Sequence, residues 1–368
     1  MKFSVKREDI LKPLQLVGGV VERRHTLPVL ANILIQLDGD RLSLTGTDLE
    51  VEIIARLNVL NGSGEGDITV PAKKFIDICR ALPDGSTLDF SLDEPKVVIK
   101  SGKSRFTLST LAASEFPAVE EGEQEYSFTC AQGDIKSLIE KTSFAMAQQD
   151  VRYYLNGMLW ELSDTTFRVV ATDGHRLALA AKDISGLKPG EDIQAILPRK
   201  GVIELNRLLD GGEQSIDVVL GKNHVRIKSE AFTFTSKLVE GKFPNYQQVI
   251  PLGGDKIILG ERLELKDAFG RTAILSNEKY RGVRLLLEPG QLTLVANNPE
   301  QEEAEDHVSV DYEGDSLEVG FNISYLQDVT NVLDSEKVKI TLSDANSSAL
   351  IQDADDDGAS YVVMPMRL

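Results

Sequence analysis

Three segments of the chain share one pattern: residues 42–50 (LSLTGTDLE), 167–175 (FRVVATDGH) and 292–300 (LTLVANNPE). In each segment apolar and polar residues alternate, which is typical of a strand with one buried face, and the strand runs into a polar turn. The turn residues Asp48, Asp173 and Asn298 are spaced 125 residues apart. This spacing indicates that the chain repeats one structural unit three times.

A second set of positions repeats in the same register, because Asn32, Gly157 and Gly282 are also 125 residues apart. Such units are much longer than the roughly 20–50 residues usual for solenoid repeats, so the pattern favours a pseudo-symmetric ring or arc of domains. We expect an α+β fold of three similar domains, formed by residues 1–125, 126–255 and 256–368.

Each unit is expected to contain two helices packed on antiparallel sheet. A short strand at 3–5, 128–130 or 256–259 leads into the first helix, and a turn or cap residue opens the second helix, namely Pro71, Pro198 or Asn322. The predicted core positions of the first helices are Ile10, Leu14, Val17 and Val21; Ile135, Leu138, Thr142 and Ala145; and Leu263, Ala268 and Thr272. Those of the second helices are Phe75, Cys79 and Leu82; Val202, Leu205 and Leu209; and Leu326, Val329 and Leu333.

Composition limits where the protein acts and what it can bind. No apolar run approaches the roughly 20 residues that cross a bilayer, the N-terminus lacks a signal-peptide core, and only Cys79 and Cys130 are present. We therefore expect a cytoplasmic protein with reduced thiols and no membrane partner. The net charge is −18, and residues 256–368 hold 22 acidic against 10 basic side chains. This balance argues against tight binding of nucleic acid over the whole surface, but it leaves room for a local basic surface.

Motifs for catalysis and cofactors are weak or missing in the sequence. No glycine-rich phosphate loop opens a helix, so we expect no ATP hydrolysis, no dinucleotide and no other cofactor. The segment from Asp353 to Gly358 fits the opening of a calcium loop, but Met364 stands where the bidentate carboxylate belongs, so we predict an acidic turn and no metal site. Asp173 beside His175 keeps a hydrolase as an alternative, although no nucleophile signature accompanies the pair. A three-domain scaffold that only binds peptides is a further alternative.

Six segments of the sequence resemble the bacterial DNA sliding clamps, the β subunits of DNA polymerase III. They are residues 42–50, 149–159 (QDVRYYLNGML), 170–177 (VATDGHRL), 198–205 (PRKGVIEL), 296–305 (ANNPEQEEAE) and 361–368 (YVVMPMRL). The resemblance covers the whole chain. It implies a non-enzymatic processivity factor, an accessory subunit of a DNA-directed DNA polymerase. Members of this family form head-to-tail homodimers that close a six-domain ring around duplex DNA.

The resemblance also implies partners and a site for them. The expected partners are a second copy of the chain, double-stranded DNA bound without sequence preference, the clamp-loader complex, the replicative polymerase subunit, repair and translesion polymerases, and mismatch-repair proteins. The protein partners insert short peptides into an apolar pocket between the second and third domains. The residues expected in this pocket are Leu155, Thr172, Gly174, His175, Arg176, Leu177, Pro244, Val249, Ser348, Val362, Met364, Pro365, Met366 and Arg367. Gln248 departs from the family, because relatives often have a basic residue there.

Two further sets of residues are expected to face DNA or a second copy. By resemblance, Arg24, Gln149, Tyr153, Tyr154 and Lys200 lie near DNA, although the tyrosines are equally typical of core aromatics. The helices offer further candidates for phosphate contacts, which are Lys6, Arg7, Lys12, Lys73, Lys136, Lys141, Arg199 and Arg207. The charge asymmetry between the first and third domains predicts an interface of Lys74, Lys103, Arg105, Phe106 and Leu108 with Ile274, Leu275, Glu300, Glu303 and Asp306.

Overall fold

The computed structural model of the protein describes residues 1–22, 27–117, 119 and 123–367. The chain forms two compact units, one of Met1–Gly133 with Lys200–Leu238 and the other of Asp134–Arg199 with Val239–Leu368. Among the described residues, no helix combines the length and the apolar character that crossing a membrane requires.

The first unit contains two antiparallel sheets. The five-stranded sheet has the order β5 (Leu60–Ser63), β1 (Lys2–Lys6), β7 (Thr87–Asp93), β8 (Lys96–Ser101), β9 (Ser104–Ser109). The eight-stranded sheet has the order β10 (Gln124–Ala131), β15 (Ser215–Gly221), β16 (His224–Lys228), β17 (Phe232–Lys237), β4 (Val51–Asn58), β3 (Arg41–Thr47), β2 (Asn32–Asp38), β6 (Gly66–Pro71).

The second unit contains one run of twelve antiparallel strands. Its order is β14 (Ile193–Pro198), β11 (Gly157–Ser163), β12 (Thr166–Thr172), β13 (Arg176–Asp183), β25 (Ala359–Val363), β24 (Ala349–Asp353), β23 (Lys337–Leu342), β18 (Lys256–Glu261), β21 (Glu303–Asp311), β20 (Gln291–Asn297), β19 (Gly282–Glu288), β22 (Leu317–Asn322).

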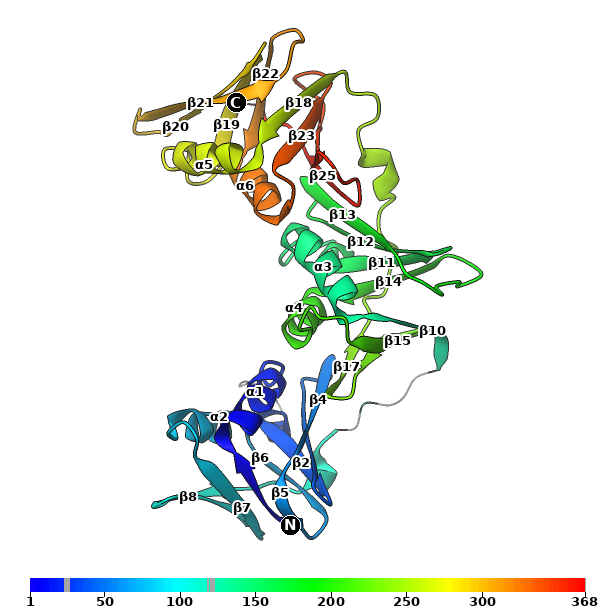
Figure 1. Ribbon diagram of the computed structural model, residues 1–368, viewed down its shortest axis with the longest axis vertical. Coiled ribbons are helices and arrows are strands. Elements are labelled where there is room, and N and C mark those ends of the chain that lie inside the picture. The colour runs from blue at the N-terminus through cyan, green and yellow to red at the C-terminus, as the bar shows by residue number, and fades with distance from the viewer. Residues whose placement is uncertain (23–26, 118, 120–122, 368) are drawn as a thin grey trace. The chain divides into compact units, whose positions relative to one another are not determined.

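Six α-helices occur in the described residues, two per repeat as expected. They are α1 (Arg7–Gly18), α2 (Ala72–Ala81), α3 (Gln132–Thr142), α4 (Arg199–Leu208), α5 (Arg262–Ala273) and α6 (Ile323–Val332). Short 3-10 helices lie at Pro28–Ala31, Ala113–Glu115, Ser143–Ala145, Tyr153–Leu155 and Tyr246–Val249. In the first unit α1 packs beside α2 and against β3 and β4, and in the second unit α5 packs beside α6 and against β20 and β21 (Figure 1).

The threefold repeat is present in the backbone register. Asn32, Gly157 and Gly282 each begin a strand, and their partners on the neighbouring strand are Pro71, Pro198 and Asn322. These partners stand directly before the second helix of each repeat. The Asn322 side chain accepts a hydrogen bond from the Ser324 backbone N–H at 2.9 Å, which caps α6 as predicted.

The predicted helix cores are largely confirmed, with two exceptions. Val21 lies beyond the end of α1 and is half-buried, whereas its neighbour Val20 is buried. The core positions of the second helices are buried in all three repeats, and so are most of those of the first helices. Leu263 is wrong, because it is 61% exposed on α5, and Leu265 and Phe269 are buried on that helix instead. Helical spacing runs equally well through either set of apolar residues, so periodicity alone did not separate them.

Sheets continue from one repeat into the next. After the turn at Asp48, β4 pairs antiparallel with β17, the last strand of the second repeat. After the turn at Asp173, β13 pairs in the same way with β25, the last strand of the third repeat. We call these two strand pairs joint 1 and joint 2. Because hydrogen-bonded strands of different repeats belong together, the two compact units cut across the 125-residue period.

A close helix-to-sheet approach in the first repeat generates a stability prediction. A Cβ added at Gly46 would lie 2.7 Å from the Val17 carbonyl oxygen, whereas one added at Gly270 of α5 would meet no atom within 4 Å. Gly46→Ala should therefore lower the free energy of unfolding by about 1–3 kcal/mol. Gly270→Ala, the matched control, should raise it by up to about 1 kcal/mol through helix propensity. Urea unfolding of both variants checks this, and equal effects would contradict the close approach.

Candidate partner-binding site

Joint 2 brings together residues that are far apart in the sequence. In its register Leu177 lies opposite Val362 and Arg176 lies opposite Val363. The Met364 backbone N–H donates to the His175 carbonyl oxygen at 3.0 Å, which continues the pairing past the end of β25. The predicted site segments at 172–177 and 362–364 are therefore adjacent because two edge strands pair.

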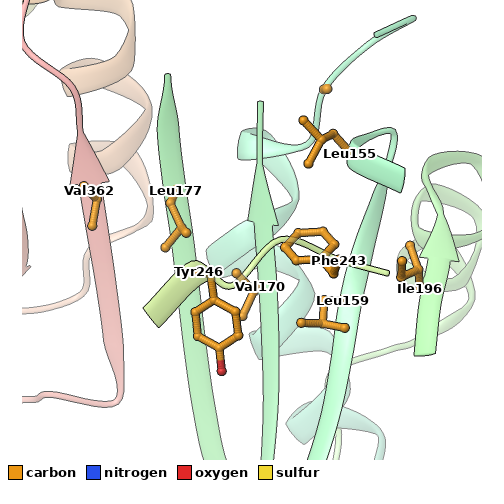
Figure 2. Close-up of a cluster of buried hydrophobic side chains, with 9 residues drawn as sticks. Leu155, Leu159, Val170, Leu177, Ile196, Phe243, Tyr246 and Val362 are labelled. Carbon is orange, nitrogen blue, oxygen red and sulfur yellow. The ribbon is translucent and has the colours of Figure 1, made fainter. Parts of the chain in front are cut away.

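A buried apolar cluster extends from this strand pair across the neighbouring strands of the sheet (Figure 2). We call it the joint 2 cluster. Three of the predicted site residues belong to it, Leu155, Leu177 and Val362, each no more than 4% exposed. Its other members are Ala147, Leu159, Val170, Ile196, Phe243 and Tyr246. The segment 243–250 contributes Phe243 and Tyr246, so residues from 147–196, 243–246 and the strand β25 share one core.

The remaining predicted site residues lie at or near the surface. Gly174, His175, Pro244 and Arg367 are exposed, and so are Val249 and Met364, at 55% and 48%. Thr172, Ser348, Pro365 and Met366 are half-buried. Exposed apolar side chains beside a cluster of buried ones form a surface to which a short apolar segment can bind.

The chain after Met364 turns away from the cluster. The Met366 backbone N–H donates to the Gly320 carbonyl oxygen at 2.7 Å. Met366 and Arg367 line a cavity of about 680 Å³ together with Tyr280, Arg284 and Asn298. The structure thus divides the predicted tail between the cluster and a separate cavity of the third repeat.

The segment 243–250 is fixed by a polar contact as well as by the cluster. The Tyr246 hydroxyl donates to Glu161 Oε1 at 2.7 Å, and the Gln194 amide donates to Glu161 Oε2 at 2.8 Å. Arg168 pairs with the same buried carboxylate. Burial raises the pKa of Tyr246, and its hydrogen bond to Glu161 adds to the rise. The hydroxyl therefore stays protonated and can act as the donor.

Arg176 connects the turn at Asp173 to the helix α6. Its Nε donates to Asp173 Oδ2 at 3.1 Å, one terminal nitrogen pairs with Asp328 on α6, and the other donates to the Phe144 carbonyl oxygen at 2.8 Å. The guanidinium carbon lies 4.3 Å from the centroid of the Tyr325 ring, a cation–π distance. With its side chain only 12% exposed, Arg176 is held mainly by contacts within its own chain.

The groups considered for catalysis and metal binding have structural roles here. Asp173 Oδ1 accepts hydrogen bonds from the backbone N–H groups of His175 and Arg176, at 2.9 and 3.0 Å. Asp353 is 5% exposed and accepts from the backbone N–H groups of Asp334 and Ser335. Within the described residues, no group of three His, Cys, Asp or Glu side chains converges as metal ligands.

The residues expected near DNA fall into three groups. Arg24 lies outside the described residues. Gln149, Tyr153 and Tyr154 share one segment of the second unit, where the two rings meet edge to face at 5.9 Å and Tyr153 is 58% exposed. In the same segment Arg152 binds both oxygens of Asp150 and lowers the pKa of that carboxyl to about 2.

Lys200 belongs to the first unit and pairs there with Asp48 and Glu22. Burial lowers its pKa, but the hydrogen bonds to these two carboxylates outweigh burial and raise it. Of the other helix cations, Arg7, Lys136, Lys141 and Arg207 form ion pairs within the chain. Lys6, Lys12 and Lys73 are exposed.

The residues expected at the interface between copies are divided between the units. In the first unit Lys74, Lys103 and Arg105 are exposed, Phe106 is half-buried, and Leu108 is only 6% exposed, so Leu108 belongs to the core of the unit. In the second unit Glu300 and Glu303 are exposed, Ile274 is 77% exposed, and Leu275 is half-buried. Asp306 pairs with Arg271 at 2.6 Å, which lowers the pKa of that carboxyl.

Several residues of the site were not predicted from the sequence. Tyr246, Glu161, Phe144, Tyr325 and Asp328 reach it only through tertiary contacts. Apolar residues of strands and a tyrosine beside a linker carry no local signal for such contacts.

Comparison with known proteins identifies the family. Models of the N-terminal, central and C-terminal domains of the DNA polymerase III beta subunit match residues 1–120, 129–245 and 247–367. The beta sliding clamps of Pseudomonas putida and Escherichia coli are 58% and 51% identical to the chain over the full length of both proteins. The crystal structure of a sliding clamp from Pseudomonas aeruginosa bound to griselimycin is 56% identical, covers all of both chains and has a TM-score of 0.97.

The fold and these relatives define a DNA polymerase sliding clamp with three clamp domains. The chain belongs to the DNA polymerase III beta subunit family. It is an accessory subunit of the polymerase rather than an enzyme, so the hydrolase alternative is wrong.

The contacts of Arg176 predict a stabilising role for it. Arg176→Met keeps an unbranched side chain of similar length but leaves Asp173 and Asp328 without their cation. We expect a loss of about 2 kcal/mol in the free energy of unfolding, since Asp328 is partly solvated and the full cost of a buried pair does not apply. Arg284→Met is the control, because its 3.7 Å pair with Glu318 is exposed and should contribute close to nothing. Urea unfolding of both variants measures the difference, and equal losses would refute the role of Arg176.

Proposed function

We propose that two copies of the chain join head to tail into a ring of six domains that encloses duplex DNA. The ring tethers the replicative polymerase and other replication and repair proteins to the DNA and is opened by a clamp loader. The proposal uses domain boundaries near residues 125 and 255 and a cytoplasmic location. Its main support is an aromatic residue that occurs at an equivalent position in the last strand of each repeat. This residue is buried in both internal joints, but it is only half-buried in the first repeat, where the strand edge is free.

The two internal joints use the same pairing. In joint 1 Phe234 lies opposite Ile53, and in joint 2 Tyr361 lies opposite Ala178. Both aromatic side chains are 0% exposed. The equivalent aromatic residue of the first repeat is Phe106 on β9, which is half-buried.

Each chain offers two complementary strand edges for a third joint. In the described residues β9 pairs only with β8, and Glu303–Val308 of β21 pairs only with β20 on one side, because β18 reaches only Val310 and Asp311. Unpaired edges invite pairing with another chain. A head-to-tail contact uses both edges, and it leaves none free if the rotation closes a ring.

The internal joints also fix the register expected between copies. The turn of the third repeat is one residue longer, because Ala296 pairs with Ala304 where Gly46 pairs with Ile53 and Ala171 with Ala178. Transferring the register through these strand pairs sets Phe106 of one copy opposite Ala304 of the other, and Arg105 opposite Glu305. Phe106 and Ala304 then face the helices, while the oppositely charged pair lies on the outer face. The charges favour correct pairing, and burial of the aromatic ring stabilises the joint.

A paired cysteine substitution tests this register. In an antiparallel pair opposite Cβ atoms lie about 5 Å apart, which allows a disulfide after small adjustment. The variant carrying Arg105→Cys with Glu305→Cys should form a covalent dimer on oxidation. The control, Arg105→Cys with Glu318→Cys, places the second thiol on β22 and should not. The native Cys79 and Cys130 are buried and should not interfere.

The same cross-linked dimer tests whether DNA is held by topology. Loaded on a nicked circle by a clamp loader with ATP and then oxidised, it should resist high salt until the circle is cut to a linear form. Non-specific phosphate contacts alone would be lost as salt rises. Equal loss from circular and linear DNA would refute the ring.

For partner peptides we propose the surface over the joint 2 cluster, which includes His175, Pro244, Val249 and Met364. Its support is that the exposed apolar residues Pro244, Val249 and Met364 are close neighbours in the chain of the buried cluster members Phe243, Tyr246 and Val362. A peptide with leucine and phenylalanine anchors should bind there with a dissociation constant near 1 μM, about −8 kcal/mol, which permits exchange of partners. Gln248 is exposed on the same segment and supplies no charge.

Substitution of an exposed residue separates this surface from the fold. Met364→Glu should weaken binding of the peptide at least about tenfold by placing a charge at an apolar contact. Leu252→Glu is the control, because Leu252 is 89% exposed and lies outside the proposed surface. Fluorescence titration of a labelled peptide checks both variants. Unchanged affinity of a folded Met364→Glu protein would place the site elsewhere.

A further inference from the structure

The equivalent turns at Asp48, Asp173 and Asn298 differ in the third repeat. In the first two repeats the turn aspartate uses Oδ1 for two backbone N–H groups and Oδ2 for a cation. Asp48 Oδ2 pairs with Lys200, and Asp173 Oδ2 accepts from Arg176. The Asp48 side chain is only 4% exposed, so its ion pair is largely shielded from solvent.

In the third repeat this turn has an asparagine. Asn298 Oδ1 accepts from the Glu302 backbone N–H at 2.9 Å, as the aspartates do. Its Nδ2, however, donates to a carboxylate oxygen of Glu302 at 2.6 Å. An amide nitrogen cannot accept a hydrogen bond from a cation. The carboxylate that Asn298 holds at this turn is therefore that of Glu302, which is exposed; Glu300 lies in the same turn and is exposed as well.

The cation of joint 1 has an equivalent on the first repeat. Lys200 follows Pro198 by two residues at the start of α4, and Lys73 follows Pro71 by two residues at the start of α2. Pro198 and Pro71 hold the same register against Gly157 and Asn32. Lys73 is exposed, and within residues 1–22, 27–117, 119 and 123–367 it has no ion pair.

We propose that Glu302 of one copy pairs with Lys73 of a second copy. This contact takes the place that the partly shielded Lys200–Asp48 pair has in joint 1. The inference rests on the head-to-tail dimer proposed above and adds a specific residue pair to it. Because both groups are exposed, salt screens their attraction far more than it screens the shielded pair of joint 1. The joint between copies is then the salt-sensitive joint of the ring.

A double-mutant cycle on the intact protein tests the pair. Lys73→Ala and Glu302→Ala should each raise the dimer dissociation constant about fivefold at low salt, since the contact occurs twice per ring. The double variant should be no weaker than either single one. Exchange of the charges, Lys73→Glu with Glu302→Lys, should restore most of the affinity lost in each single exchange. Lys12→Ala, an exposed lysine on α1, is the control and should leave the constant unchanged. Sedimentation over a dilution series gives the constants.

A second variant restores the arrangement of the other repeats. Asn298→Asp with Glu302→Gln places a carboxylate at the turn, where Asp48 stands in the first repeat. The dimer should then be less sensitive to salt than the wild type. Additive effects in the cycle, or an unchanged salt dependence in this variant, would overturn the Lys73–Glu302 pair. A wild-type chain that neither dimerises nor forms the Arg105–Glu305 cross-link would instead overturn the head-to-tail dimer itself.

Discussion

Pairing of edge strands between repeats is the interaction on which the rest of the structure depends. An unpaired strand edge exposes backbone donors and acceptors and promotes unwanted association. In joint 1 and joint 2 that edge is covered by the last strand of the next repeat, and an aromatic side chain at the centre of each joint is fully buried. The pairing makes the sheets continuous, fixes the spacing of the repeats and brings the turn at Asp173 next to the C-terminal strand. The apolar cluster and the contacts of Arg176 follow from this adjacency.

Much of the fold could be predicted because each repeat carries short-range sequence signals for its strands and helices. The 125-residue spacing placed the strand starts at Asn32, Gly157 and Gly282, and helix-opening residues marked Pro71, Pro198 and Asn322. These signals depend on residues close together in the chain. The joints could not be predicted in the same way, since β13 and β25 are separated by more than a hundred residues and their alternating patterns are compatible with many partners. Leu263 failed for a related reason, because a helix with several apolar residues does not itself show which of them faces the core.

The candidate site was accessible to sequence reasoning only in part. Resemblance pointed to Leu155, Leu177 and Val362, which the structure gathers in one cluster. It gave no indication of the buried Glu161 carboxylate that holds the Tyr246 hydroxyl, or of Asp328 and Tyr325 around Arg176. Such contacts join side chains from separate elements, and each residue taken alone is an ordinary strand or helix residue. For Arg176, the sequence predicted a residue of the partner site. The structure shows that its guanidinium is mainly engaged by contacts within its own chain.

Leu177 and Val362 have two structural roles. They lie opposite each other in the strand register of joint 2, and both belong to the joint 2 cluster. The surface therefore exists only where β25 has added to β13. A chain in which the C-terminal strand was lost, cleaved or not yet folded would lack the packed base on which an apolar ligand rests. Under the proposed function, binding of a partner at this surface requires completed folding of the second unit and therefore depends on the last strand of the chain being in place.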